Sequence, residues 1–221
     1  MDVKNINNVD AVIIGAGIMG LSTAYYLSQK GINTCIIERE NYIGGHTTLR
    51  CAGGVRQQFS SHMNILLSIL NRQMLQNLEK DSHYKIPFIP CGYAFAFTKD
   101  DSAVQAEKAV KMQREMSINV ELLSPKDTKA MFPNIRVDDV LLTTYCCDDG
   151  LLDVGALLIL LKRELDKRNV KILCETVVCG IETENGHVSK VLLNKGEIKT
   201  SIVVNAAGPW AKQIGNMLGL T

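Results

Sequence analysis

The chain has 221 residues, 46% of them hydrophobic, and 24 Lys and Arg against 23 Asp and Glu leave a net charge of +1. This length and apolar fraction suffice for a buried core in one or two domains. The near-zero net charge argues against a nucleic-acid-binding surface. The longest uncharged apolar stretch, 154–161, is too short to span a bilayer, and no signal-peptide pattern is present. We therefore expect a soluble cytoplasmic protein without a transmembrane segment.

Three glycines, Gly15, Gly17 and Gly20, follow a short apolar run at 11–14. A helix is predicted directly after them, over about 17–30. In a strand–turn–helix unit the first glycine permits the tight turn, the second lets the backbone approach a pyrophosphate, and the third allows close helix–strand packing. The helix would also direct free N–H groups and its positive dipole end at the phosphates. The alternative is a glycine-rich turn that only packs a helix on a sheet.

Glu38 closes the second predicted strand of this unit. At a strand end its carboxylate can accept hydrogen bonds from the 2′ and 3′ hydroxyls of a ribose, and it would repel a 2′-phosphate. The residues therefore favour FAD or NAD over NADP.

A long amphipathic helix is predicted after a Gly- and Thr-rich connection over 42–56, capped by Ser60 or Ser61. Its apolar residues recur at helical spacing, which we interpret as core packing. They are Met63, Leu66, Leu67, Leu70, Met74 and Leu78.

The block that follows has the pattern of an α+β insertion. Ser124 and Pro125 are typical of an N-cap and first helical position. Beyond the insertion, a turn at Asn185 and Gly186 joins two strands of an antiparallel excursion. The expected strands are 92–98, 119–123, 140–146, 170–174, 177–182, 188–193 and a short buried strand at 201–205; the expected helices are 101–116, one beginning at Pro125, and 153–168.

These elements predict an α/β fold: a Rossmann-like, doubly wound parallel sheet interrupted by an α+β substrate domain. The domains we expect are 1–85 and 151–221 for the two parts of the nucleotide-binding domain, and 86–150 for a partial substrate domain.

Seven cysteines form an odd set without a CxxC pair, and several lie in strand-like runs. Reduced, mostly buried thiols in a cytosolic protein are the simplest interpretation, and a redox role for the adjacent Cys146 and Cys147 is the alternative. Neither a zinc-ligand spacing, nor a Ser-His-Asp order, nor a P-loop lysine occurs, so no metal site is expected and catalytic residues are not assigned.

Five stretches resemble the amino-acid-oxidase (DAO-type) family of flavoproteins, in particular the sarcosine oxidase β subunit and glycine oxidase-like proteins. They occur in the family's order and cover nearly the whole chain: 12–27, 36–39, 44–59, 148–157 and 203–215. The resemblance implies FAD as the dinucleotide. It also implies hydride removal from the carbon next to the nitrogen of a small amino or imino acid such as sarcosine, glycine or proline.

The resemblance carries cofactor contacts over to residues of this sequence. Gly15, Ala16, Gly17, Ile18, Met19 and Gly20 would meet the pyrophosphate, and Glu38 and Arg39 the adenosine. His46, Thr47 and Thr48 would cover the pyrophosphate and ribityl chain, with a solvated loop histidine as the alternative for His46. Ala52, Gly53, Gly54 and Val55 would approach the isoalloxazine, Val178 the adenine, and Ala206, Ala207 and Gly208 the strand end beside the cofactor.

Some relatives attach FAD through a histidine at the position that Arg50 occupies here. Arginine cannot form that bond, so we expect noncovalent FAD. Arg50 and Arg56 are also candidates for binding a substrate carboxylate, because a guanidinium offers a bidentate fork. Surface or phosphate-binding roles are the alternatives for both.

The chain ends soon after the AAGPWA segment, whereas family members continue for well over a hundred residues. The resemblance therefore implies a missing C-terminal part, or a complementary subunit that completes the fold. Two other hypotheses stay open: a noncatalytic FAD-binding fragment or assembly subunit, and a nicotinamide-dependent dehydrogenase.

Overall fold

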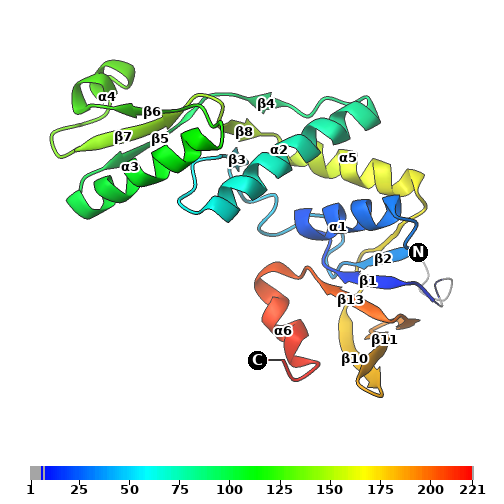
Figure 1. The fold of residues 1–221 in the computed structure, drawn as a ribbon. Helices are drawn as coiled ribbons and strands as arrows, with labels where there is room; N and C mark the ends of the chain where they lie inside the picture. The colour runs from blue at the N-terminus through cyan, green and yellow to red at the C-terminus, as the bar shows by residue number, and fades with distance from the viewer. Residues whose placement is uncertain (1–5, 7, 221) are drawn as a thin grey trace. The chain divides into compact units, whose positions relative to one another are not determined.

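The computed structural model describes residue 6 and residues 8–220, and the chain divides into two compact units (Figure 1). The first unit comprises residues 1–51 and 154–221, and the second comprises residues 52–153. No helix among the described residues is both long and apolar enough to cross a membrane.

A parallel sheet forms the centre of the first unit. Its strand order is β13 (Ile202–Asn205), β1 (Ala11–Ile14), β2 (Thr34–Ile37) and β9 (Lys171–Leu173), and every neighbouring pair is parallel. All residues of β1 and β2 are buried. Helices α1 (Ile18–Gln29) and α5 (Val154–Lys167) pack against each other beside this sheet. This confirms the predicted α/β class with a parallel sheet.

An antiparallel sheet packs against the parallel one. It consists of β10 (Val178–Glu184), β11 (His187–Leu193) and β12 (Gly196–Lys199), the last of which was not predicted. Ile181, Val191 and Ile198 from this sheet share one apolar core with β1, β2 and β9. Asn185 and Gly186 both have positive φ at the β10–β11 turn, as the Asn-Gly pair predicts.

Strand β13 lies at an edge of the parallel sheet, and the prediction that it is buried is wrong. Ile202 and Asn205 are exposed and the two valines between them are only half-buried. The apolar run Ile202–Val204 identified the strand, but burial requires cover on its outer side. The chain continues from β13 into a 3-10 turn η2 (Gly208–Trp210) and helix α6 (Ala211–Asn216), whose Ile214 joins the core.

The second unit has the predicted α+β composition. Its larger sheet has the antiparallel order β5 (Tyr93–Phe97), β7 (Leu142–Cys146) and β6 (Val120–Leu123). Its helices are α2 (His62–Ser82), α3 (Asp100–Glu115) and α4 (Pro125–Met131), and a small sheet contains β3 (Gly54–Val55), β8 (Gly150–Leu152) and β4 (Phe88–Ile89). Ser61 and Ser124 cap α2 and α4 through their side chains, as predicted.

Helix α2 presents most of its predicted core stripe to solvent, so that interpretation is wrong except at Leu78. Met63 is 61% exposed and Leu67 48% exposed, and Leu66, Leu70 and Met74 are also exposed. The buried side of the helix instead carries Ile65, which packs with residues of α3, β6 and β7. The helix is apolar around more of its circumference than its neighbours cover, so the periodicity alone did not identify the buried side.

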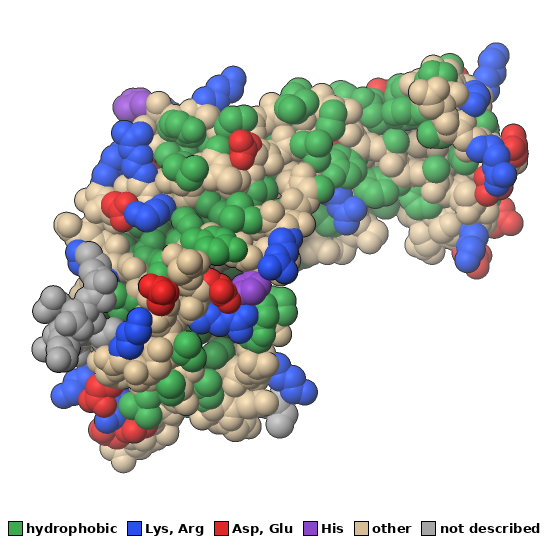
Figure 2. Space-filling view, turned by 180° about the vertical axis from the view of Figure 1, so that it is seen from behind, with side chains coloured by type: hydrophobic (Ala, Val, Ile, Leu, Met, Phe, Trp, Pro, Cys, Tyr) green, Lys and Arg blue, Asp and Glu red, His purple; other side chains and the backbone are tan. Residues whose placement is uncertain are grey.

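Apolar side chains reach the surface elsewhere too. Figure 2 shows them in green between groups of charged side chains.

The prediction of mostly buried thiols is wrong, because only Cys35 and Cys146 of the seven cysteines are buried. Burial raises the pKa of Cys35 to about 12 and that of Cys146 to about 11.

The boundaries of the compact units differ from the domain limits drawn on the sequence. The division falls after Cys51 and after Asp153 rather than near 85 and 150. The first boundary lies earlier than the predicted 85 because helix α2 belongs to the second unit, where its Ile65 is part of the core. Which unit binds which ligand stays a prediction.

Glu164 on α5 is a buried carboxylate held by two cations. Its side chain is 6% exposed, and it accepts hydrogen bonds from Lys167 Nζ at 2.6 Å and Arg168 Nη1 at 2.8 Å. Burial alone raises the pKa of Glu164, but these two partners outweigh burial and hold it below the usual value. The pair therefore stabilises the fold above the usual carboxyl pKa, and that contribution is lost as the pH falls through the lowered pKa.

We expect Glu164→Gln to lower the free energy of unfolding at pH 7 by about 1–2 kcal/mol. Denaturant unfolding at pH 7 and pH 3.5 measures this, and the difference from the parent chain should shrink at the lower pH. Asp166→Asn is the control, since Asp166 is 55% exposed in its pair with Lys162 and should cost less than about 0.5 kcal/mol. Equal losses of unfolding free energy in Glu164→Gln and Asp166→Asn would contradict the conclusion that burial makes the Glu164 ion pairs the stronger ones.

Candidate functional site

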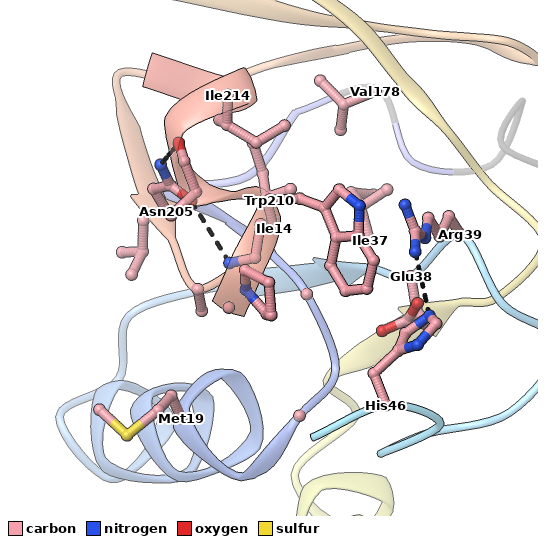
Figure 3. A pocket seen from close by; sticks show the side chains of 18 of the residues that line it. Ile14, Met19, Ile37, Glu38, Arg39, His46, Val178, Asn205, Trp210 and Ile214 are labelled. Atoms are coloured by element: carbon pink, nitrogen blue, oxygen red, sulfur yellow. Dashed lines mark hydrogen bonds between the residues drawn. The ribbon is translucent and has the colours of Figure 1, made fainter. Parts of the chain in front are cut away.

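A cavity of about 740 Å³ lies in the first unit, at the carboxyl ends of three parallel strands. Ile14, Ile37 and Asn205 end β1, β2 and β13 at its wall, and the start of α1, the 44–48 loop and the η2–α6 segment complete it (Figure 3). Open α/β sheets bind ligands at this edge.

The three glycines meet the steric requirements of a dinucleotide turn. Gly15 has φ +108°, and a Cβ there would collide with the carbonyl oxygen of Ala206; a Cβ on Gly20 would collide with the carbonyl oxygen of Gly15. Gly17 is the N-cap of α1 and provides no side-chain cap, while Ile18 N donates to Thr48 Oγ1 at 3.2 Å. Gly17, Ile18 and Met19 line the cavity, so the start of α1 lies at its wall. The first N–H groups of a helix lack acceptors within the helix, and such an end suits an anion.

Glu38 is fixed in orientation at the end of β2. It is 9% exposed, its Oε2 accepts a hydrogen bond from Ala16 N at 2.8 Å, and its Oε1 accepts one from Glu40 N at 3.0 Å. Each carboxylate oxygen has a further lone pair, so both can still accept from a hydroxyl. The side chain lines the cavity and can serve a ribose diol.

A cluster of four side chains lies beside Glu38. The Arg39 guanidinium is 3.7 Å from the centroid of the Trp210 ring, and the His46 ring is 4.5 Å from it. His46 Nε2 is 2.8 Å from Glu40 Oε1 and 3.0 Å from Arg39 Nη2. The hydrogen bond with His46 is the main reason that the pKa of Glu40 lies below its usual value. Figure 3 shows the indole next to Arg39, with a dashed line joining Arg39 to His46.

Neither Glu40 nor Trp210 is among the site residues predicted from the sequence. Trp210 is the single tryptophan of the chain and follows directly on the AAGP segment, a signal that could have singled it out. Asn205 fixes this segment, because its Nδ2 donates to Ala211 O at 2.8 Å and its Oδ1 accepts from Ala207 N at 3.3 Å.

Most of the predicted cofactor residues line the cavity. Ala16 and Gly20 do not, since Ala16 N is bonded to Glu38 and Gly20 packs on Gly15. The segment 52–55 belongs to the second unit. The predicted residues in the cavity wall are Gly15, Gly17, Ile18, Met19, Glu38, Arg39, His46, Thr47, Thr48, Val178, Ala206, Ala207 and Gly208.

A second cavity, of about 600 Å³, lies within the second unit. Arg56 is in its wall, with its guanidinium 4.9 Å from the centroid of the Phe59 ring and 5.3 Å from that of Phe95. Among the described residues no carboxylate forms an ion pair with Arg56. Asn64 and Tyr93 add polar groups to the wall. Arg50 lines neither of these two cavities.

The family model described as "DAO: FAD dependent oxidoreductase" matches residues 10–221. The bovine "FAD-dependent oxidoreductase domain-containing protein 1" is 31% identical over 96% of this chain and 49% of its own length. Mouse mitochondrial sarcosine dehydrogenase is 28% identical over 97% of this chain and 24% of its own. The crystal structure of L-proline dehydrogenase from P. horikoshii gives a TM-score of 0.88 at 28% identity, covering 98% of this chain and 57% of that one. The chain thus spans half or less of the length of these curated relatives.

Proposed function

Because the chain belongs to the DAO family of FAD-dependent oxidoreductases, we propose that it binds FAD noncovalently in the cavity of the first unit. The observation that carries this proposal is the convergence of the Gly15–Gly20 turn, the start of α1 and Glu38 on one cavity. The start of α1 would hold the pyrophosphate, and Glu38 the adenosine ribose. Arg50, at the position where some relatives carry the flavin-linked histidine, supports a noncovalent attachment.

We propose further that the protein takes part in oxidising the C–N bond of a small amino or imino acid. FAD supplies the redox chemistry in this family. The substrate would lose a hydride, which FAD would accept, from the carbon next to its nitrogen and a proton from the nitrogen. Water would then hydrolyse the imine to a 2-oxo acid or an aldehyde, with release of ammonia or an amine. The names of two relatives, which specify proline and sarcosine, support this class of substrate.

We propose Arg56 as the group that binds the substrate carboxylate. Its side chain is held over two aromatic rings, lines a cavity and has no carboxylate partner among the described residues. A guanidinium in that state can form two parallel hydrogen bonds with a carboxylate. Arg50 lacks these surroundings, so of the two sequence candidates Arg56 is favoured.

The test is an anaerobic titration of the FAD-loaded chain with proline, sarcosine and glycine. The readout is the loss of the flavin absorbance. Arg56→Lys should raise the concentration needed for half-bleaching about tenfold, because lysine is a point charge without the fork. FAD affinity should be unchanged. Arg50→Lys is the matched control and should leave both quantities unchanged. Equal effects of the two variants would contradict the assignment of Arg56.

The noncatalytic alternative, a fragment or assembly subunit that needs a partner chain, is favoured by the exposed stripe on α2. An uncharged, exposed apolar helix face is typical of an interface, and the β13 edge offers unpaired backbone groups. FAD binding without bleaching by any of the three amino acids would support this alternative.

The cellular location stays a prediction. The cytoplasm is the location expected from the sequence, and the mitochondrion is the alternative that the name of the mouse relative suggests.

A further inference from the structure

A buried carboxylate, that of Asp149, lies at the turn between β7 and β8 of the second unit. The residue is 1% exposed, and no Lys or Arg of the described residues forms an ion pair with it. Burial raises the pKa of Asp149, and hydrogen bonds to its charged form oppose this rise. A buried carboxylate without an ion pair costs free energy that a well-packed apolar side chain would not. Packing alone therefore does not explain an aspartate at this position.

The carboxylate of Asp149 binds the backbone directly after Arg56. Its Oδ1 accepts a hydrogen bond from Gln57 N at 2.8 Å, between residues 92 positions apart in the sequence. On the other side of Arg56, Val55 of β3 pairs with Gly150 of β8. Because the peptide unit between Arg56 and Gln57 is planar, fixing its N–H direction also restricts the backbone dihedral of Arg56. Two consecutive residues, Asp149 and Gly150, thus hold the backbone on both sides of Arg56.

The same aspartate also holds a second residue of the cavity wall. Asp149 Oδ2 accepts from Gln58 Nε2 at 3.0 Å, and Gln58 Nε2 also donates to Tyr93 O at 2.9 Å. Gln58 is 8% exposed, and its Oε1 has no hydrogen-bond partner among the described residues, so its NH₂ group makes both links. The backbone oxygen of Asp149 accepts from Gly92 N at 2.8 Å. Arg56 and Tyr93 both line the cavity of about 600 Å³, and Asp149 therefore connects two parts of its wall.

We propose that Asp149 is a positioning residue that holds the Arg56 guanidinium in place for the substrate carboxylate. The inference rests on the proposed function, in which Arg56 binds that carboxylate. The rings of Phe59 and Phe95 lie under the guanidinium and hold the end of the side chain, while Asp149 holds the backbone from which it extends. A bidentate pair needs both donors aligned with the carboxylate oxygens, so a small shift of this backbone lowers substrate affinity.

Asp149→Asn tests this role, because it keeps the size of the side chain. An asparagine has one oxygen for two donors, so its NH₂ group opposes either Gln57 N or Gln58 Nε2. We expect the amino-acid concentration for half-bleaching to rise about tenfold. FAD affinity should stay unchanged within about a factor of two, since Asp149 belongs to the second unit.

Asp148→Asn is the matched control. It removes the same charge from the neighbouring, half-buried residue, whose carboxylate bonds to neither Gln57 nor Gln58. This variant should change neither the half-bleaching concentration nor the FAD affinity.

A double-mutant cycle with Arg56→Lys separates positioning from a general loss of structure. Lysine is a flexible point charge without the fork, so its binding depends little on the exact backbone position. In the Arg56→Lys chain, Asp149→Asn should therefore raise the half-bleaching concentration by less than about twofold. Independent effects of the two substitutions would instead multiply to about 100-fold.

Gln58→Met is a second, milder variant. It keeps the hydrogen bond from Gln57 N to Asp149 and removes only the links from Gln58 to Asp149 and Tyr93. We expect a rise of about threefold in the half-bleaching concentration, which should also be absent from the Arg56→Lys chain. If Asp149→Asn does not fold, Gln58→Met decides by the same criteria.

An unchanged half-bleaching concentration in these variants, or effects that multiply with that of Arg56→Lys, would overturn the role of Asp149 while leaving the proposed function in place. A parent chain that no amino acid bleaches would overturn the proposed function together with this role.

Discussion

Gly15→Ala is expected to lower FAD affinity at least 100-fold and to reduce the free energy of unfolding by about 2–4 kcal/mol. Gly15 has φ +108°, where L side chains are strained, and the added methyl group would meet the carbonyl oxygen of Ala206 at the end of β13. Two strand ends of the cavity would then have to move apart. FAD titration and denaturant unfolding of the same preparation measure the two effects.

Gly31→Ala separates backbone strain from the steric collision. Gly31 follows α1 with φ +75°, and a Cβ there has nothing within 4 Å. We expect this variant to lose about 1 kcal/mol of stability through strain alone, with FAD affinity unchanged within a factor of two. If Gly15→Ala behaved like Gly31→Ala, the glycine turn would not be the steric determinant of the cavity.

Glu38→Ala is expected to weaken FAD binding about 100-fold, which corresponds to about 2.7 kcal/mol. The substitution removes the acceptor proposed for the ribose hydroxyls and leaves the N–H groups of Ala16 and Glu40 without their partner. Glu38→Gln should have a smaller effect, since one amide oxygen can still accept while the NH₂ group opposes the second N–H donor.

Glu175→Gln is the matched control for Glu38. Glu175 is an exposed acidic residue after the neighbouring strand β9 and does not line the cavity. Its replacement removes the same charge from the same edge of the sheet without touching the proposed ribose site. An equal loss of affinity in Glu175→Gln would indicate a general electrostatic effect instead of a direct contact.

The β1–α1–β2 unit could be predicted from the sequence because local signals define all of its parts. The buried strands, the positions of Gly15 and Gly20, and the carboxylate at the end of β2 are specified within 30 consecutive residues. The structure places all of them as the pattern indicates.

The cluster around His46 could not be predicted in the same way. Glu40 and Trp210 lie 170 positions apart in the sequence, and only the parallel pairing of β13 with β1 brings their segments together. The exposure of α2 and β13 was missed for a related reason. Apolar residues at helical or strand spacing show which element forms, whereas burial depends on which other elements cover it.

The most direct test of FAD binding is the visible absorption spectrum of the purified full chain, recorded after incubation with FAD and removal of free cofactor. We predict a flavin spectrum at about one FAD per chain, with all the flavin released into the supernatant on denaturation. Quenching of the Trp210 fluorescence should accompany binding, because the chain's only tryptophan lines the cavity. A colourless chain, with Trp210 fluorescence unaffected by added FAD, would contradict the proposed site.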